Sequence, residues 1–468
     1  MRVLFATSEL YPFVKTGGLG DVAAGMPQAM DKIGVDIRYF LPGYPEIKKN
    51  LRHKKTIHDF DALFGQTSCR IVLGTLPGGI KAYILDAPGF FERSHPYLDE
   101  EGKDWEDNHL RFGAFCYAAA HLVQYDPKWA PDILHGNDWQ CGLIPAYKAF
   151  GRLSFATIMT IHNIGYQGLF PAEYLSQLHL PPESLSVYGV EYYNQIGFLK
   201  AGLYYADHLT TVSPTYADEI CTPEMGCGLE GLLVTRRHDL TGILNGIDGD
   251  IWDPRMDPAL AFQYNEKTLA PKRQDKKVLL KELGLKGKEK EILLGFIGRL
   301  TPQKGIDLLL EALPLLEDQK LNLIIVGTGD AALEEQCRMV AEQYPDRVVA
   351  HIGYDEDLAH RVIAGADAII VPSYFEPCGL VQMYALRYGA LPIVRQTGGL
   401  ADSVTPQTGF LFEGQTPQDL KNALLDAINL YYNAPKTWAK MQKTAMKQDF
   451  SWDASAKEYC SVYTRLLA

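Results

Sequence analysis

Short apolar runs alternate with longer amphipathic stretches along the first half of the chain. The stretch GLGDVAAGMPQAMDKIG, 18–34, has the periodicity of a helix that ends near Gly34. Strands are predicted from apolar, β-branched runs at 2–7, 35–42, 132–137, 156–163 and 208–213. Strands that are apolar throughout and alternate with helices are typical of parallel sheets covered on both faces. This half of the chain is therefore predicted to be a doubly wound α/β domain.

The alternation stops near residue 245 and then begins again. The stretch ILNGIDGDIWDP, 243–254, is dense in Gly, Asp and Pro and predicts turns. Further strands are predicted at 292–298, 322–327, 347–353, 367–373 and 391–396. An amphipathic C-terminal helix is predicted to follow a Ser451 cap. The prediction is thus a Rossmann-like domain at 1–244, a linker at 245–255, a second Rossmann-like domain at 256–450 and a final helix at 451–468.

Composition narrows the class of partner. Hydrophobic residues make up 47% of the 468 residues, and the net charge of −12 disfavours nucleic acid or an anionic membrane surface. The eight cysteines include no CxxC pair, which favours reduced thiols over a zinc site. The apolar start breaks at Thr7-Ser8-Glu9, and no run approaches the ~20 apolar residues of a membrane span. We therefore expect a cytoplasmic protein.

A glycine-rich loop, VKTGGLGDV at 14–22, follows the first predicted strand. Amides at a helix N-terminus attract anions, and Gly17 and Gly18 would let a phosphate approach the backbone. Lys15 adds a cation, whereas Asp21 is equally compatible with capping. The alternative is a tight turn with a solvated lysine. TGGLAD at 397–402 repeats the pattern, with Gln396 in place of the lysine.

Two further strand ends carry charged residues. In GRLTPQKG, Arg299 and Lys304 suit a diphosphate and its departure as a leaving group, although two surface cations are the simpler alternative. In FEPCGL, Glu376 would accept hydrogen bonds from sugar hydroxyls, and Pro377 is predicted to start a helix. Cys378, in this helix start, is compatible with a reactive thiol, but a buried, inert thiol is the commoner state and is predicted here.

Two neighbouring strand ends carry the same polar pattern. HGNDW places His135, Asn137, Asp138 and Trp139 after one strand, and TIHN places His162 and Asn163 after the next. Either histidine is compatible with a structural role or with an orienting or basic one. Tyr97, in a polar loop, is a candidate for stacking on a sugar ring.

Three stretches resemble other kinds of site. VGTGDAA, 326–332, fits a dinucleotide fingerprint, but equally a turn that seats a phosphate or packs a helix. DGD at 248–250 and DED at 355–357 resemble metal-binding triplets, but both lie in turn-like sequence. We expect no metal at either.

In combination, these motifs resemble those of the bacterial and plant glycogen and starch synthases. The resemblance spans nearly the whole chain and rests on KTGGLGDV, HGNDW, TIHNIGYQG, FLKAGLYYAD, TVSPTYADEI, NGIDGDIWDP, GRLTPQKG, FEPCGL and TGGLAD. It implies the GT-B fold, with two Rossmann-like domains facing across a deep cleft and a C-terminal helix that crosses back to the first. It also implies transfer of glucose from ADP-glucose to the 4-hydroxyl at the non-reducing end of an α-1,4-glucan such as glycogen, with retention and without metal or cofactor.

The resemblance also assigns roles to matching residues. Lys15, Gly17 and Gly18, with Asp21 nearby, would contact the donor phosphates, while Arg299 and Lys304 would stabilise the departing ADP. Glu376 and the amides of Cys378, Gly379 and Leu380 would hold the glucosyl unit. Asp138, His162, Asn163 and Asn245 would line the sugar side, with His162 facing the reacting carbon. Tyr97 and Trp139 are candidates for acceptor binding.

One position departs from the pattern of many retaining GT-B enzymes. These carry a second glutamate eight residues after the first, where this chain has Tyr384. A double displacement on a carboxylate therefore loses its obvious second acid, and a front-face route is favoured.

Four alternatives remain at this point. They are a sucrose- or trehalose-type synthase of the same fold, a pyridoxal-phosphate-dependent glucan phosphorylase, an NAD-dependent dehydrogenase built on VGTGDAA, and a non-catalytic protein that binds nucleotide sugar or glycogen.

Overall fold

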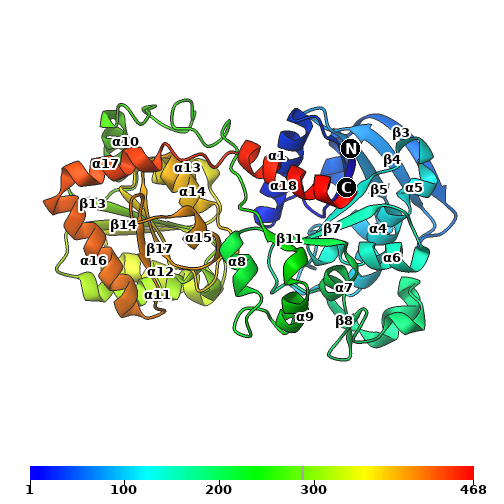
Figure 1. Cartoon of the computed structure of the whole chain (residues 1–468). Coiled ribbons are helices and arrows are strands. Elements are labelled where there is room, and N and C mark those ends of the chain that lie inside the picture. Colours follow the sequence, from blue (N-terminus) through cyan, green and yellow to red (C-terminus); the bar gives the residue numbers. More distant parts are fainter. Residues whose placement is uncertain (286–288) are drawn as a thin grey trace. The chain divides into compact units, whose positions relative to one another are not determined.

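The computed structural model describes residues 1–285 and 289–468, which form two compact units (Figure 1). The first unit comprises Met1–Gly246 together with Trp452–Ala468, and the second comprises Ile247–Ser451. None of the helices in the described part of the chain combines the length and the apolar character needed to cross a bilayer.

The sheet of the first unit is mixed. Over the described residues its strand order is β12 (Leu240–Gly242), β11 (His208–Thr211), β7 (Ala156–Ile161), β6 (Ile133–Asn137), β1 (Arg2–Ala6), β2 (Asp36–Pro42), β5 (Lys81–Asp86), β4 (Cys69–Thr75) and β3 (Arg52–Phe60). The strands from β12 to β5 pair in parallel, whereas β3, β4 and β5 pair antiparallel. The prediction of a wholly parallel sheet is therefore wrong at this edge. Most of β3 is exposed, so it lacks the apolar run by which strands such as β1 and β2 were found. The neighbouring strands β4 and β5 were not predicted either.

The first helix of this unit buries one face and packs on β2. On α1 (Gly18–Lys32), Leu19, Val22, Ala23, Met26 and Met30 are buried at helical spacing. The other helices are α2 (Pro45–Asn50), α3 (Pro88–Phe91), α4 (Asn108–Ala120), α5 (Leu122–Tyr125), α6 (Ile144–Gly151), α7 (Phe198–Tyr205), α8 (Pro214–Glu219) and α9 (Glu230–Thr235). The strands β8 (Leu169–Pro171), β10 (Gln195–Gly197) and β9 (Glu191–Tyr192) form a separate small sheet.

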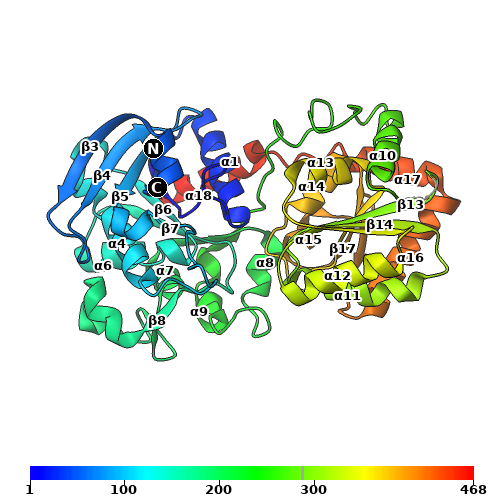
Figure 2. The same cartoon turned by 180° about the vertical axis from the view of Figure 1, so that it is seen from behind.

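The C-terminal helix α18 (Trp452–Leu467) belongs to the first unit, as predicted, and lies beside α1 in both views (Figures 1 and 2). Gly25 of α1 leaves room for the Trp452 indole, because a Cβ at Gly25 would overlap that ring. The Tyr463 hydroxyl lies 2.7 Å from Nδ1 of the buried His135. This contact gives His135 a structural role in seating α18.

The second unit has a parallel sheet, as predicted. Its order over the described residues is β15 (Val348–Ile352), β14 (Leu321–Gly327), β13 (Ile292–Ile297), β16 (Ala368–Val371), β17 (Leu391–Arg395) and β18 (Phe410–Phe412). Its helices are α10 (Ala270–Glu282), α11 (Ile306–Ala312), α12 (Ala331–Gln343), α13 (Glu356–Gly365), α14 (Val381–Arg387), α15 (Gly398–Ser403), α16 (Pro417–Asn433) and α17 (Pro435–Ala445). Figure 2 shows α13 and α14 on one side of this sheet and α11 and α12 on the other.

The turn-rich stretch that follows Gly246 packs firmly within the second unit. The Trp252 ring stacks on His360 of α13 and on Tyr384 of α14, with centroids 3.7 and 3.8 Å away. Asp257, which is buried, lies 2.7 Å from Nδ1 of His360 and accepts a hydrogen bond from the Tyr388 hydroxyl. These contacts fix the stretch against α13 and α14.

Candidate active site

The first glycine loop leaves open space beside its backbone. It ends where α1 begins, at Gly18, and a Cβ built on Gly17 or Gly18 would meet no atom within 4 Å. The Lys15 Nζ lies 2.8 Å from Oδ1 of Asp21 in the first turn of α1. Asp21 therefore holds the lysine beside the helix N-terminus, with the two glycines open to an approaching anion.

A buried carboxylate that the sequence analysis did not select organises this loop. Glu9 is 3% exposed, and its Oε2 accepts hydrogen bonds from the amides of Thr16 at 2.7 Å and Gly17 at 3.4 Å. Its Oε1 accepts from the Thr16 hydroxyl at 2.6 Å and the Tyr97 hydroxyl at 2.8 Å. The only signal in the sequence was an acidic residue shortly after a buried strand.

Asp138 and His162 meet at the carboxyl ends of β6 and β7, which are adjacent strands. Oδ1 of Asp138 accepts hydrogen bonds from the amides of His162 at 2.8 Å and Asn163 at 3.4 Å. Asp138 has a backbone φ of +56° and is buried. A positive φ at a non-glycine residue costs free energy and recurs at functional sites. The structure thus brings Asp138, His162 and Asn163 together.

Burial moves the two titrating side chains in opposite directions. It raises the pKa of Asp138 to about 7, even though the two backbone amides oppose the shift. It lowers the pKa of His162 to about 3, so the imidazole is neutral at neutral pH. The His162 Nε2 lies 2.9 Å from Oδ1 of Asn137 and donates to it, which leaves Nδ1 as the accepting nitrogen. His162 can therefore orient a hydroxyl group but cannot serve as a general acid.

The two residues predicted to bind the acceptor, Trp139 and Tyr97, are engaged in contacts within the protein. Trp139 is 9% exposed, and its indole lies among the rings of Phe112, Phe170 and Phe198. The Tyr97 hydroxyl is hydrogen-bonded within the loop network around Glu9. Contact of either ring with an acceptor stays a prediction.

Asn245 lies in the first unit near its boundary and is also buried. Its Oδ1 has no hydrogen-bond partner among residues 1–285 and 289–468.

In the second unit, Lys304 and Glu376 form a close ion pair. The Lys304 Nζ lies 2.5 Å from Oε2 of Glu376, which also accepts from the Ser373 hydroxyl at 3.0 Å. Glu376 is 5% exposed, so its charge is balanced within the fold. Arg299 follows β13 and is exposed, and its guanidinium has no ion-pair partner in the described part of the chain. The structure leaves Arg299 available to an anion.

The segment after Glu376 is not the start of a helix. α14 begins at Val381, so the prediction of a helix from Pro377 is wrong. Gly379 takes a φ of +72°, a left-handed conformation that a helix start excludes. Cys378 is buried, as predicted. The amides of Cys378, Gly379 and Leu380 therefore belong to an irregular loop.

The second glycine loop packs directly on this segment. A Cβ at Gly398 would overlap the Glu376 carbonyl oxygen, and one at Gly399 would overlap the Cys378 carbonyl oxygen. The Gly399 amide also donates to the Glu376 carbonyl at 3.1 Å. The glycines of this copy thus let two backbone segments approach each other.

The stretches resembling other sites have local structural roles. In VGTGDAA, Asp330 caps α12 through the amides of Ala332 and Leu333, and Glu334 accepts from the Gly329 amide. These amides are therefore occupied by protein carboxylates. Asp248 accepts from the Asp250 amide in a turn, and Asp355 caps α13. Within residues 1–285 and 289–468, no cluster of three or more His, Cys, Asp or Glu is suited to a metal ion.

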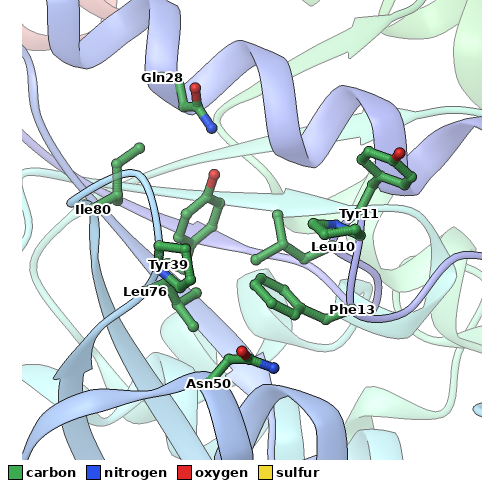
Figure 3. A pocket seen from close by; sticks show the side chains of 10 residues that line it. Leu10, Tyr11, Phe13, Gln28, Tyr39, Asn50, Leu76 and Ile80 are labelled. Atoms are coloured by element: carbon green, nitrogen blue, oxygen red, sulfur yellow. The ribbon is translucent and has the colours of Figure 1, made fainter. Parts of the chain in front are cut away.

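A cavity of about 320 Å³ lies behind the first glycine loop (Figure 3). Leu10 and Phe13 form one wall, and the amides of Gln28 and Asn50 lie at opposite edges. The rest of the lining is mostly apolar and comprises Tyr11, Pro12, Tyr39, Leu76, Pro77 and Ile80. None of the predicted site residues lines it.

Two Rossmann-like units, one with an open glycine loop and one with cations at a strand end, are the parts expected of a GT-B glycosyltransferase, and the comparisons with known proteins assign the chain to this class. Comparison with family models gives the starch synthase catalytic domain over residues 2–235 and glycosyl transferases group 1 over residues 280–448. The chain belongs to the glycogen and starch synthase family of glycosyltransferases.

Individual proteins agree with this assignment. A glycogen synthase of Aromatoleum aromaticum is 47% identical, with coverage of 100% of this chain and 97% of that protein. A glycogen synthase of Francisella tularensis subsp. novicida is 44% identical, with coverage of 100% and 99%. The catalytic domain of starch synthase IV from Arabidopsis thaliana, solved with ADP and acarbose, superposes with a TM-score of 0.88 at 33% identity and covers 100% of this chain and 99% of that chain.

Proposed function

We propose that this chain transfers glucose from ADP-glucose to the 4-hydroxyl at the non-reducing end of an α-1,4-glucan, with retention of configuration and release of ADP. The observation that carries the proposal is the full-length similarity to a starch synthase solved with ADP and acarbose. We further propose that glycogen is the acceptor and that the reaction is cytoplasmic, which agrees with relatives named glycogen synthase.

The donor is proposed to bind through its diphosphate. Arg299 offers a planar fork of donors and Lys304 a point charge, a pairing that suits a diphosphate. Lys15 and the amides of Gly17 and Gly18 are proposed to add phosphate contacts. These cations provide the charge that a metal supplies in other transferases, so we expect activity to persist after chelation.

The sugar side is proposed to be held by neutral and hydrogen-bonding groups. Glu376 and the amides of Cys378, Gly379 and Leu380 would bind the glucosyl hydroxyls. Asp138, His162, Asn163 and Asn245 are proposed to line the other side of the ring. A neutral His162 suits this role, because its accepting Nδ1 can orient a hydroxyl beside the reacting carbon.

The proposed reaction proceeds on one face of the sugar. The bond from C1 to the ADP phosphate oxygen breaks, and its electron pair leaves with ADP. The acceptor O4 then bonds to C1 from the same face, and its proton passes to the departing phosphate. Arg299 and Lys304 stabilise the charge that develops on that phosphate.

The position of Tyr384 supports this route over double displacement. Tyr384 lies on α14 with its ring stacked on Trp252, at the position where many retaining GT-B enzymes carry a glutamate. The remaining carboxylate, Glu376, is engaged by Lys304 and Ser373. At the position of Tyr384 there is thus no carboxylate that could form a covalent glucosyl intermediate.

The proposal is tested by supplying labelled ADP-glucose or UDP-glucose at equal concentration with glycogen as primer. We expect label to enter glycogen chiefly from ADP-glucose and to be released by an exo-acting α-1,4-glucanase. Equal use of the two donors would overturn the donor assignment. Transfer to a small sugar instead of glycogen would indicate a sucrose- or trehalose-type synthase, and binding without turnover a non-catalytic protein. Phosphorolysis of the glucan, together with the absorbance of bound pyridoxal phosphate, would indicate a phosphorylase.

A further inference from the structure

The glycine loop that carries Lys15 is held by contacts within itself and to α1, and by Glu9. Leu10 and Val14 pair through backbone hydrogen bonds of 2.9 Å, which closes a short turn within the loop itself. Leu10 and Phe13 face the cavity of about 320 Å³, and Leu10 is itself buried. On the other side, Gly17 and Gly18 have open space beside them. The backbone directly after Lys15 therefore has open space on one side.

Glu9 restrains this backbone from a fixed position. It follows β1 closely and is buried, so its carboxylate is placed by the sheet. The carboxylate accepts two amides and one hydroxyl from Thr16 and Gly17, the residues directly after Lys15. Hydrogen bonds to a charged acceptor are stronger than those to a neutral one. Glu9 thus fixes the backbone on which the lysine and the open amides are mounted.

The same carboxylate reaches a second predicted subsite. Its Oε1 accepts from the Tyr97 hydroxyl, and that hydroxyl also lies 2.7 Å from Oγ of Ser8. Tyr97 comes from a loop 88 residues further along the chain. One buried side chain therefore connects the proposed phosphate loop to the tyrosine proposed for the acceptor.

We propose that Glu9 is a positioning residue that holds the Lys15 loop in its donor-binding conformation and couples that loop to Tyr97. The proposal rests on the proposed function, in which this loop contacts the donor phosphates. Glu9 acts through Thr16, Gly17 and Tyr97.

The first test compares Glu9→Ala, Glu9→Gln and the control Glu183→Gln, an exposed glutamate of the same unit. Glu9→Ala should raise KM for ADP-glucose about 10-fold, because a misplaced loop loses phosphate contacts. Glu9→Gln should restore KM to within about 3-fold of wild type, because its amide oxygen can still accept from Thr16 and Gly17 while its NH₂ donates to the hydroxyls. An unchanged KM in Glu9→Ala would overturn the proposal, as would a KM in Glu9→Gln as high as in Glu9→Ala.

A second readout needs no donor. Trypsin cleavage after Lys15, followed by mass spectrometry of the released N-terminal peptide, reports the order of the loop directly. We expect cleavage at this bond to be several-fold faster in Glu9→Ala than in wild type and unchanged in Glu183→Gln. Equal cleavage rates would contradict the positioning role. If Glu9→Ala is cleaved faster than wild type but the wild-type protein does not use ADP-glucose, the positioning role of Glu9 in the loop stands and the proposed function is rejected.

The coupling is tested with Tyr97→Phe, which keeps the ring and removes the hydroxyl. The combined effect of Glu9→Ala and Tyr97→Phe on KM for ADP-glucose should be smaller than the product of their separate effects, because both remove one connection. If Glu9→Ala does not fold, Thr16→Val provides the same test by removing one hydroxyl donor, with an expected rise in KM of about 2–5-fold. Independent effects in the double variant would disprove the coupling.

Discussion

The two copies of TGGL(G/A)D have nearly the same sequence but different structural surroundings. In the first copy, Gly17 and Gly18 face open space, and Lys15 stands beside them. In the second, Gly398 and Gly399 lie against the carbonyls of the Glu376 loop. Glycine permits close approach in both copies, of a ligand in one and of the protein's own backbone in the other.

This difference shows what a glycine motif specifies. The motif places a helix N-terminus after a strand, at α1 and again at α15. Whether the backbone then receives a ligand depends on what the rest of the fold puts in the space beside it. In the second unit that space holds the segment that carries Glu376, so the second loop supports a site residue.

The largest expected effect comes from the cations of the second unit. Arg299→Ala and Lys304→Ala should each lower kcat by ~10²-fold or more, because each removes a group that stabilises the leaving phosphate. Steady-state incorporation of labelled glucose into glycogen measures this, with Lys320→Ala as a control at an exposed lysine of the same unit. A wild-type kcat in either variant would refute its role.

The next largest effect concerns stability and separates the two loops. Gly399→Ala should lower the free energy of unfolding by about 1–3 kcal/mol, because its Cβ overlaps a backbone carbonyl. Gly17→Ala should stay within about 0.5 kcal/mol of wild type, because it meets no neighbour. Urea unfolding of both variants checks the pair, and similar losses would remove the distinction drawn between the loops.

The pH dependence of stability tests the environment of the first unit's site. Because the pKa of Asp138 is raised to about 7, the folded chain keeps a proton there that the unfolded chain has lost above its ordinary pKa of 3.8. This group's contribution to stability is therefore present below pH 4 and is lost as the pH rises towards 7.

Asp138→Asn removes that titration. We expect the stability of Asp138→Asn relative to wild type to rise between pH 4 and 7 and to level off above. Urea titrations at several pH values measure it. The low pKa of His162 has the opposite effect, a loss of stability as the pH falls from 6.5 towards 3, but it is present in both proteins and cancels. A constant difference between the two proteins would contradict a buried, protonated Asp138.

The fold was largely predictable because its strands are buried. Most of the parallel strands carry apolar runs, which is how they were found, but the parallel strands β5, β12 and β18 were not predicted. The antiparallel edge was missed because β3 is a polar edge strand, and its pairing with β4 is formed by tertiary contact. The helix predicted from Pro377 was missed for a similar reason, since Gly398 and Gly399, distant in sequence, hold that segment as a loop.

The residues of the candidate site could be predicted only where they belong to a recognisable sequence motif. Lys304 and Glu376 were each selected from local sequence, and the structure joins them in an ion pair. Glu9 was not selected, because a single acidic residue carries no pattern and one of its partners, Tyr97, is 88 residues away. Trp139 was selected for its aromatic ring, although the other rings around it form a core that local sequence does not reveal.

The most direct test of the account compares Lys15→Ala with Gln396→Ala, the corresponding exposed positions of the two loops. The measurement is KM for ADP-glucose in the transfer of labelled glucose to glycogen. The account predicts a rise of about 10-fold or more in Lys15→Ala, the scale of one lost hydrogen bond to a charged group, and a change of less than about 2-fold in Gln396→Ala. Equal effects in the two variants, or none in Lys15→Ala, would contradict it.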